Sequence, residues 1–120
     1  MMDTKELGVF GEEHAALYLE DMGYRILARN YRSRYGEIDI IAEHQGTIVF
    51  VEVKARRSYF YGEPKESIHI SKQRKLIRTA MIYLQEKEWE DRECRFDAIE
   101  VVFLPNGSIG PYHIENAFSE

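Results

Sequence analysis

Apolar residues occupy every second position in two runs near the middle of the chain, residues 36–44 and 47–57, and many of them are β-branched. This alternation is typical of β-strands. Gln45 and Gly46 separate the runs, and glycine accepts the positive φ of a tight turn. The pattern predicts a β-hairpin with one apolar face, made of Ile38, Ile40, Ala42, Val49, Val51 and Val53. The other face also carries Ile41 and Phe50, so we expect the hairpin to lie in the centre of a sheet.

A turn centred between residues 45 and 46 sets the pairing of the hairpin. It places Asp39 opposite Glu52 and Glu37 opposite Lys54, with all four side chains on one face. Carboxylates directly opposite each other lie about 5 Å apart and repel, so the first pair needs a compensating cation. Mg²⁺ prefers oxygen ligands of this kind. A solvated strand face with mixed charges is the alternative, and it fits poorly with partial burial of the carboxylates.

The flanking segments predict two helices and further strands. Residues 4–22 have helical periodicity, with Asp3 and Glu6 spaced as in a capping box and Gly23 just past the end. Residues 24–32 and 95–104 predict strands, and residues 112–114 a short edge strand. Glu12 shares a helix face with small residues, so it points either at the sheet or past its boundary into solvent.

The second helix is predicted over residues 70–88. Its apolar stripe comprises Ile70, Ile77, Ala80, Met81 and Leu84. Gln73 occupies a position on this stripe where an apolar residue was expected. We therefore expect the Gln73 amide to face the sheet near the hairpin carboxylates.

Composition favours one domain, residues 1–120. Hydrophobic residues make up 44% and charged residues 31% of the chain, as in ordinary globular proteins. The single cysteine excludes an internal disulfide, and no apolar run has the length of a membrane span. The charged N-terminal residues do not resemble a secretion signal. We therefore expect a cytoplasmic protein with no membrane partner.

The net charge of −5 argues mildly against a nucleic-acid partner, but the basic residues are clustered. Charged solvent-exposed faces are the plainer alternative. Tyr59, Phe60 and Tyr61 would either stack on bases or fold onto the core. The candidate nucleic-acid-binding residues are Arg29, Arg32, Arg34, Arg56, Arg57, Lys72 and Lys75.

Five short segments carry a resemblance to a known family. They are Gly11-Glu12 with Ala15, Asn30-Tyr31-Arg32, Gly36-Glu37-Ile38-Asp39, Val51-Glu52-Val53-Lys54 and Arg95-Phe96-Asp97. Over nearly the whole chain the sequence resembles the YraN-like family of small bacterial proteins. That family belongs to the PD-(D/E)xK nuclease superfamily and is similar to archaeal Holliday-junction resolvases. Ile38 stands where the superfamily usually has proline.

The resemblance implies an α/β fold with a restriction-endonuclease-like αβββαβ core, in which a central mixed sheet has a helix on each face. It implies that Asp39, Glu52 and the carbonyl of Val53 hold Mg²⁺ or Mn²⁺. Lys54 would position the attacking water or stabilise charge on the phosphorus, and Glu12 would help to bind metal or orient water. Two residues would support the site: Glu37, as the neutralising partner of Lys54, and Gln73.

The resulting hypothesis is a metal-dependent endonuclease that hydrolyses DNA, including branched or junction DNA. A homodimer would supply the two sites that cutting both strands of a junction requires. The alternative is a non-catalytic nucleic-acid- or protein-binding module that keeps the fold. The sequence leaves open the choice between DNA and RNA and the role of Asp97.

Overall fold

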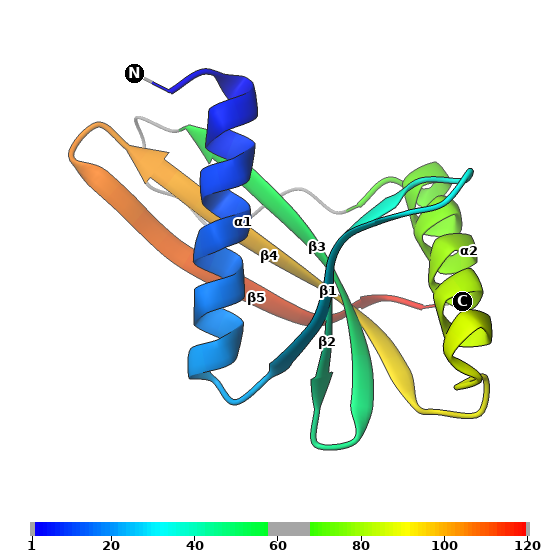
Figure 1. The fold of residues 1–120 in the computed structure, drawn as a ribbon. Coiled ribbons are helices and arrows are strands. Elements are labelled where there is room, and N and C mark those ends of the chain that lie inside the picture. The colour runs from blue at the N-terminus through cyan, green and yellow to red at the C-terminus, as the bar shows by residue number, and fades with distance from the viewer. Residues whose placement is uncertain (1, 58–67, 120) are drawn as a thin grey trace.

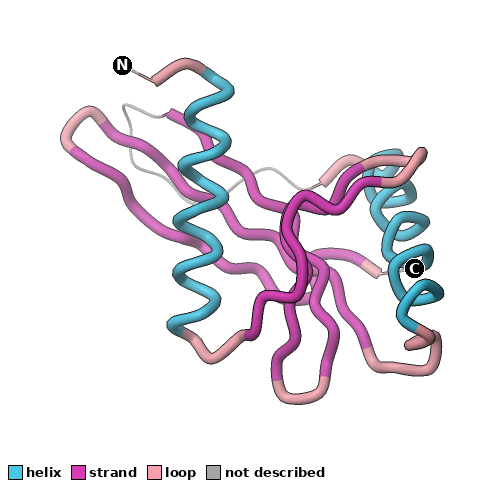
Figure 2. Tube along the Cα trace, viewed as in Figure 1, coloured by secondary structure: helices cyan, strands magenta, loops and turns pink. Residues whose placement is uncertain are grey.

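The computed structural model describes residues 2–57 and 68–119, which form a twisted five-stranded sheet and two helices (Figures 1 and 2). In chain order the elements are α1 (Thr4–Asp21), β1 (Arg25–Arg32), β2 (Glu37–His44), β3 (Thr47–Arg57), α2 (Ile70–Lys87), β4 (Cys94–Leu104) and β5 (Gly107–Phe118). The strands lie side by side in sequence order; β3 and β4 run parallel and the other neighbours antiparallel. The expected α/β fold with a mixed sheet is confirmed. The aromatic segment Tyr59-Phe60-Tyr61 lies outside the described residues.

The ends of α1 follow the predicted signals. The carboxylate of Asp3 accepts a hydrogen bond of 2.8 Å from the backbone N–H of Glu6, and the Glu6 carboxylate accepts one of 3.1 Å from the N–H of Asp3. Gly23 follows the helix with a φ of 91°. These contacts satisfy backbone groups that a helix end otherwise leaves unpaired.

The two helices pack on opposite faces of the sheet, because alternate side chains of a strand point to opposite sides. The core beneath α1 includes Ala15, Ala16, Leu19, Ile40, Ala42, Val49, Val51, Ile99 and Val101. The core beneath α2 includes Ile38, Ile41, Ile48, Phe50, Leu76, Ala80, Tyr83, Leu84 and Phe96. β3 contributes to both cores, so it lies at the centre of the structure as expected.

Two predicted faces are wrong in detail. Ile38 packs in the α2 core, whereas Ile40 packs in the α1 core, so the two residues do not share a face. The strict alternation fails here because β2 leaves β3 just before Ile40. On α2, Ile70 and Met81 are exposed, because the helix presents a neighbouring face to the sheet. The buried residues of α2 are Leu76, Thr79, Ala80, Tyr83 and Leu84.

β5 is longer than the edge strand expected at residues 112–114, because it pairs along most of β4. A buried network joins the two strands to α1. Asp97, which is fully buried, accepts hydrogen bonds from Arg95 and from the backbone N–H of Asn116, and it contacts the His113 ring at 2.8 Å. His113 in turn contacts the Tyr18 hydroxyl at 2.9 Å. Burial alone would raise the pKa of Asp97, but hydrogen bonds from His113 and Arg95 hold it below the usual value.

Candidate functional site

The β2–β3 hairpin has the predicted turn and register. Both turn residues have positive φ, 52° and 84°. The paired residues run from His44 and Thr47 at the turn to Ile40 and Val51. This is the register that was expected to bring Asp39 towards Glu52.

Asp39 lies one residue beyond Ile40 and Val51, the last residues that pair between β2 and β3. There its Oδ2 atom accepts a hydrogen bond of 2.8 Å from the backbone N–H of Val53. A side-chain carboxylate thus takes a strand N–H at the point where β2 separates from β3. This hydrogen bond fixes the Asp39 carboxyl group beside Val53, the residue that follows Glu52.

The Asp39 carboxyl group lies close enough to that of Glu52 for the two acids to affect each other's charge. Glu52 is 4% exposed and Asp39 is half-buried, so the pair is largely shielded from water on the Glu52 side. Burial, and next the negative charge and hydrogen bond of Glu52, raise the pKa of Asp39 to about 8; Glu12 adds to the rise, while the Val53 N–H opposes it. Like charges this close are costly unless a proton or a cation compensates them.

α1 delivers Glu12 to the same region. A Cβ added at Gly11 would lie only 2.6 Å from the Cβ of Ala55, so α1 crosses β3 at a distance that only glycine permits. Glu12 follows Gly11, and its Oε1 accepts a hydrogen bond of 3.0 Å from the Nδ2 of Asn30. The structure therefore brings Glu12 close enough to influence Asp39, as the helix face of small residues suggested.

α2 contributes a cation to the carboxylates. Lys72 forms an ion pair with Oε2 of Glu52 across the α2 face of the sheet. The sequence placed Lys72 among the nucleic-acid-binding residues, and nothing in its spacing from Glu52 indicated this pairing. Gln73, expected near the carboxylates, donates its side-chain amide to the carbonyl of Ile68 at 2.7 Å and holds the start of the helix.

Glu37 and Lys54 lie beyond the part of the hairpin in which β2 and β3 are paired, so the ladder itself does not place them opposite each other. Glu37 pairs with Arg32 at 2.5 Å, on the other side of the point where β2 and β3 separate. Lys54 lies beside Glu100 in the parallel β3–β4 ladder. Glu100 is 5% exposed and pairs with Arg56 at 3.3 Å, so a further buried acid, which the sequence analysis did not single out, flanks Lys54.

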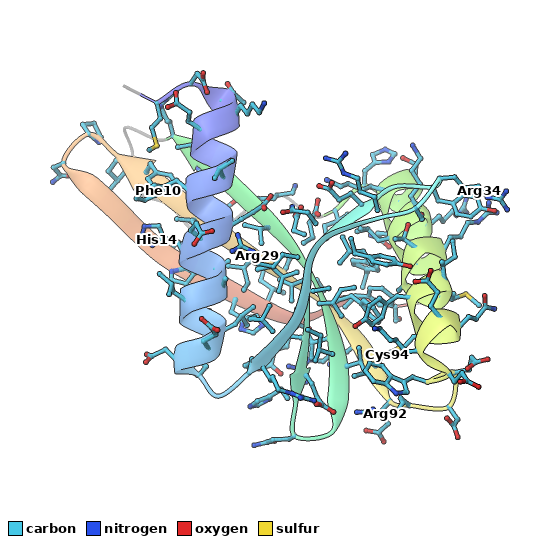
Figure 3. The ribbon with its side chains drawn as sticks, viewed as in Figure 1. Phe10, His14, Arg29, Arg34, Arg92 and Cys94 are labelled. Carbon is cyan, nitrogen blue, oxygen red and sulfur yellow. The ribbon has the colours of Figure 1, made fainter. Side chains whose placement is uncertain are left out.

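The basic residues expected to bind nucleic acid divide into two groups. Four have acidic partners: Arg29 with Glu13, Arg32 with Glu37, Arg56 with Glu100, and Lys72 with Glu52. Arg34, Arg57 and Lys75 have no acidic partner within residues 2–57 and 68–119. Figure 3 shows the contrast between Arg29, which lies between α1 and β1, and Arg34, which extends from the turn beside α2.

The donor set fits a hard dication. In the part of the chain that the structure describes, no three His, Cys, Asp or Glu side chains gather to hold a metal. A metal here would take the two carboxylates of Asp39 and Glu52, the carbonyl of Val53, and oxygens from water or substrate. Mg²⁺ commonly binds through one or two carboxylates together with substrate phosphates.

No helix in the described part of the chain is both long and apolar enough to cross a membrane. Residues 11–101 match a family described as "Uncharacterised protein family UPF0102". A UPF0102 protein of Persephonella marina is 52% identical over 111 residues, which cover 92% of this chain and 91% of the relative. A UPF0102 protein of Symbiobacterium thermophilum is 48% identical over 115 residues, covering 96% and 98%. The chain therefore belongs to the UPF0102 family, the YraN-like proteins that its motifs resemble.

Proposed function

We propose that this protein is a metal-dependent endonuclease that hydrolyses phosphodiester bonds in DNA, including branched DNA. The observation that carries the proposal is the close approach of two acids, the buried Glu52 and the half-buried Asp39, which is fixed by the hydrogen bond from the Val53 N–H to the Asp39 carboxylate. Holding a second acid against the buried Glu52 without benefit to function would only cost stability. A dication bound between the two carboxylates would offset that cost, because it attracts both negative charges.

The side chains around the pair have distinct roles in this proposal. A dication held there would polarise a phosphodiester oxygen and lower the pKa of a bound water. Lys54 lies two residues after Glu52 and so faces the same side of β3. Its ammonium group would orient the attacking water and stabilise the negative charge that grows on the phosphoryl oxygens. Glu12, held by Asn30, would orient that water from the α1 side.

A panel of substrates tests the proposal. Linear duplex, flap and four-way junction DNA are incubated with the protein in Mg²⁺ or Mn²⁺, and products are resolved on gels. We expect cleavage of at least one substrate by the wild type and its loss in Asp39→Asn, Glu52→Gln and Lys54→Met. Glu12→Gln should also weaken cleavage, and Glu13→Gln is its matched control, because Glu13 is the neighbouring helix residue and pairs with Arg29. Failure to cut any substrate, or equal cutting by Asp39→Asn, would refute the proposal.

The second candidate is a binding module without catalytic activity. One observation favours it: Lys72 already supplies a positive charge to Glu52, so the fold has its own cation at the site. Calorimetry with Mn²⁺ separates the two candidates. A nuclease binds Mn²⁺ and loses the binding in Glu52→Gln, whereas a module that relies on Lys72 binds no Mn²⁺ in either form.

A further inference from the structure

The turn between β1 and β2 is fixed against α2. The Ser33 hydroxyl accepts a hydrogen bond of 3.0 Å from the backbone N–H of Tyr35 and contacts the hydroxyl of Thr79 at 2.8 Å. Thr79 is fully buried and donates its hydroxyl hydrogen to the carbonyl of Lys75. Gly36 closes the turn, where an added Cβ would lie 3.6 Å from the Cβ of Lys75. The turn is thus held rigidly to the helix.

This rigid turn brings two arginines to one aromatic ring. The guanidinium carbon of Arg34 lies 5.0 Å from the centre of the Tyr35 ring, and that of Arg78 lies 5.1 Å from it. Both arginines are exposed, and neither has an acidic partner among the described residues. Elsewhere on the sheet Arg25, like Arg29, is neutralised by a glutamate. Two uncompensated cations, each about 5 Å from the centre of one ring, form a binding place for an anion.

Further cations connect this place to the carboxylates. Lys72, Lys75 and Arg78 are spaced three apart, so they follow one side of α2. A pocket of about 270 Å³ opens between the helix and the turn and is lined by Gly36, Glu37, Ser71, Lys72, Lys75 and Leu76. Lys72, which lines this pocket, also pairs with Glu52. The six helical steps from Lys72 to Arg78 span about 9 Å of helix axis, or about two to three nucleotide steps along one strand.

We propose that Arg34 and Arg78, oriented by Tyr35, bind a backbone phosphate of the DNA strand, two to three nucleotides from the bond placed at Asp39 and Glu52. The guanidinium group suits this role because its planar fork binds phosphate oxygens in pairs. Such contacts fix the position of the strand and do not read its sequence. The inference rests on the proposed function for the nature of its ligand, and it identifies which of the many basic residues bind that ligand.

Binding without cleavage tests the proposal. Wild type and variants are titrated into fluorescent duplex and four-way junction DNA in EDTA, and anisotropy is followed at several salt concentrations. Each phosphate contact adds about 0.9 to the slope of log affinity against log salt, which amounts to about eightfold in affinity at 0.1 M salt. Because the two guanidinium groups share one phosphate, we expect Arg34→Gln and Arg78→Gln each to lose up to about this much in affinity and slope. Arg25→Gln is the matched control, since its guanidinium is paired with Glu43, and we expect a change below about twofold.

Tyr35 provides a test that does not alter charge. Tyr35→Phe keeps the ring and should bind DNA as the wild type does, whereas Tyr35→Leu should weaken binding by releasing both guanidinium groups. Thermal unfolding confirms that each variant is folded. Unchanged affinity and salt slope in Arg34→Gln and Arg78→Gln, or no DNA binding by the wild type, would overturn the inference. If these variants lose binding but the wild type cuts nothing, the phosphate site stands and the nuclease proposal fails. If the wild type cuts DNA and both arginine variants bind and cut it equally well, the nuclease proposal stands and the phosphate site fails.

Discussion

The close crossing of α1 over β3 yields a prediction whose magnitude follows from the structure. In Gly11→Ala the new methyl carbon would lie 2.6 Å from the Cβ of Ala55, whereas carbon atoms in contact prefer about 3.5–4.0 Å. The helix and the strand must therefore separate by about 1 Å. Overpacking of this kind costs about 1–3 kcal/mol, and the better helix propensity of alanine returns about 1 kcal/mol. We expect Gly11→Ala to lower the free energy of unfolding by up to about 2 kcal/mol.

Gly8→Ala is the matched control on the same helix. A Cβ at Gly8 meets no described atom within 4 Å, so only the gain in helix propensity remains. We expect this variant to raise the free energy of unfolding by about 1 kcal/mol. Urea denaturation measures both variants under identical conditions. Equal stabilisation by the two substitutions would refute the argument that α1 needs glycine to approach the strand.

Gly11 and Ala55, which meet where α1 crosses β3, also test whether this crossing positions the candidate site. Gly11 precedes Glu12, and Ala55 follows Lys54, so separating the helix from the strand moves both candidate catalytic groups. Displacements of about 1 Å can cost about 10²-fold in rate. We expect Gly11→Ala to lose cleavage to this extent, and Ala55→Gly to restore both stability and cleavage in the double variant. A double variant that stays impaired would show that the contact with Ala55 is not the cause.

Three further predictions concern the charged groups. The pKa of Asp39 is about 8 in the folded protein against 3.8 ordinarily, so the folded state keeps this proton to higher pH and its stability should fall as pH rises from about 4 to 8. Asp39→Asn should remove this fall and stabilise the protein at pH 8 by a few kcal/mol, measured by urea denaturation with EDTA. An unchanged pH dependence would contradict the assignment. Lys72→Met removes the ammonium group that competes for Glu52, so Mn²⁺ should bind about tenfold more tightly in calorimetry, with Lys5→Met as control; weaker binding would show that Lys72 assists the metal. Asp97→Asn breaks a buried ionic network and should cost about 3–5 kcal/mol of stability, measured by denaturation; a cost below about 1 kcal/mol would mean that Arg95 and His113 find other partners.

Local signals predicted the parts of the fold that local chemistry determines. The turn at Gln45 and Gly46 set the hairpin register, because a two-residue turn with positive φ values matches the twist of the strands that it joins. The capping box at Asp3 likewise marked the start of α1. The face of α2 could not be assigned as reliably, because apolar residues surround Leu76 and Tyr83 on both sides and tertiary packing selects among them.

Contacts between distant segments of the chain could not be predicted from the sequence. The pairing of Lys72 with Glu52 depends on how α2 lies over β3, and the neutralisation of Arg29 depends on α1 lying beside β1. Spacing along the chain carries no signal for either. The departure of β2 from β3 at Asp39 was equally hidden, because alternation continues in the sequence where the ladder ends.

The most direct measurement is anomalous diffraction from crystals of the protein grown with Mn²⁺. We predict one strong peak between the carboxylates of Asp39 and Glu52, within bonding distance of an oxygen of each, with the Lys72 ammonium group displaced from Glu52. A peak at other residues, or clear density with Lys72 still bound to Glu52 and no metal between the acids, would contradict the account.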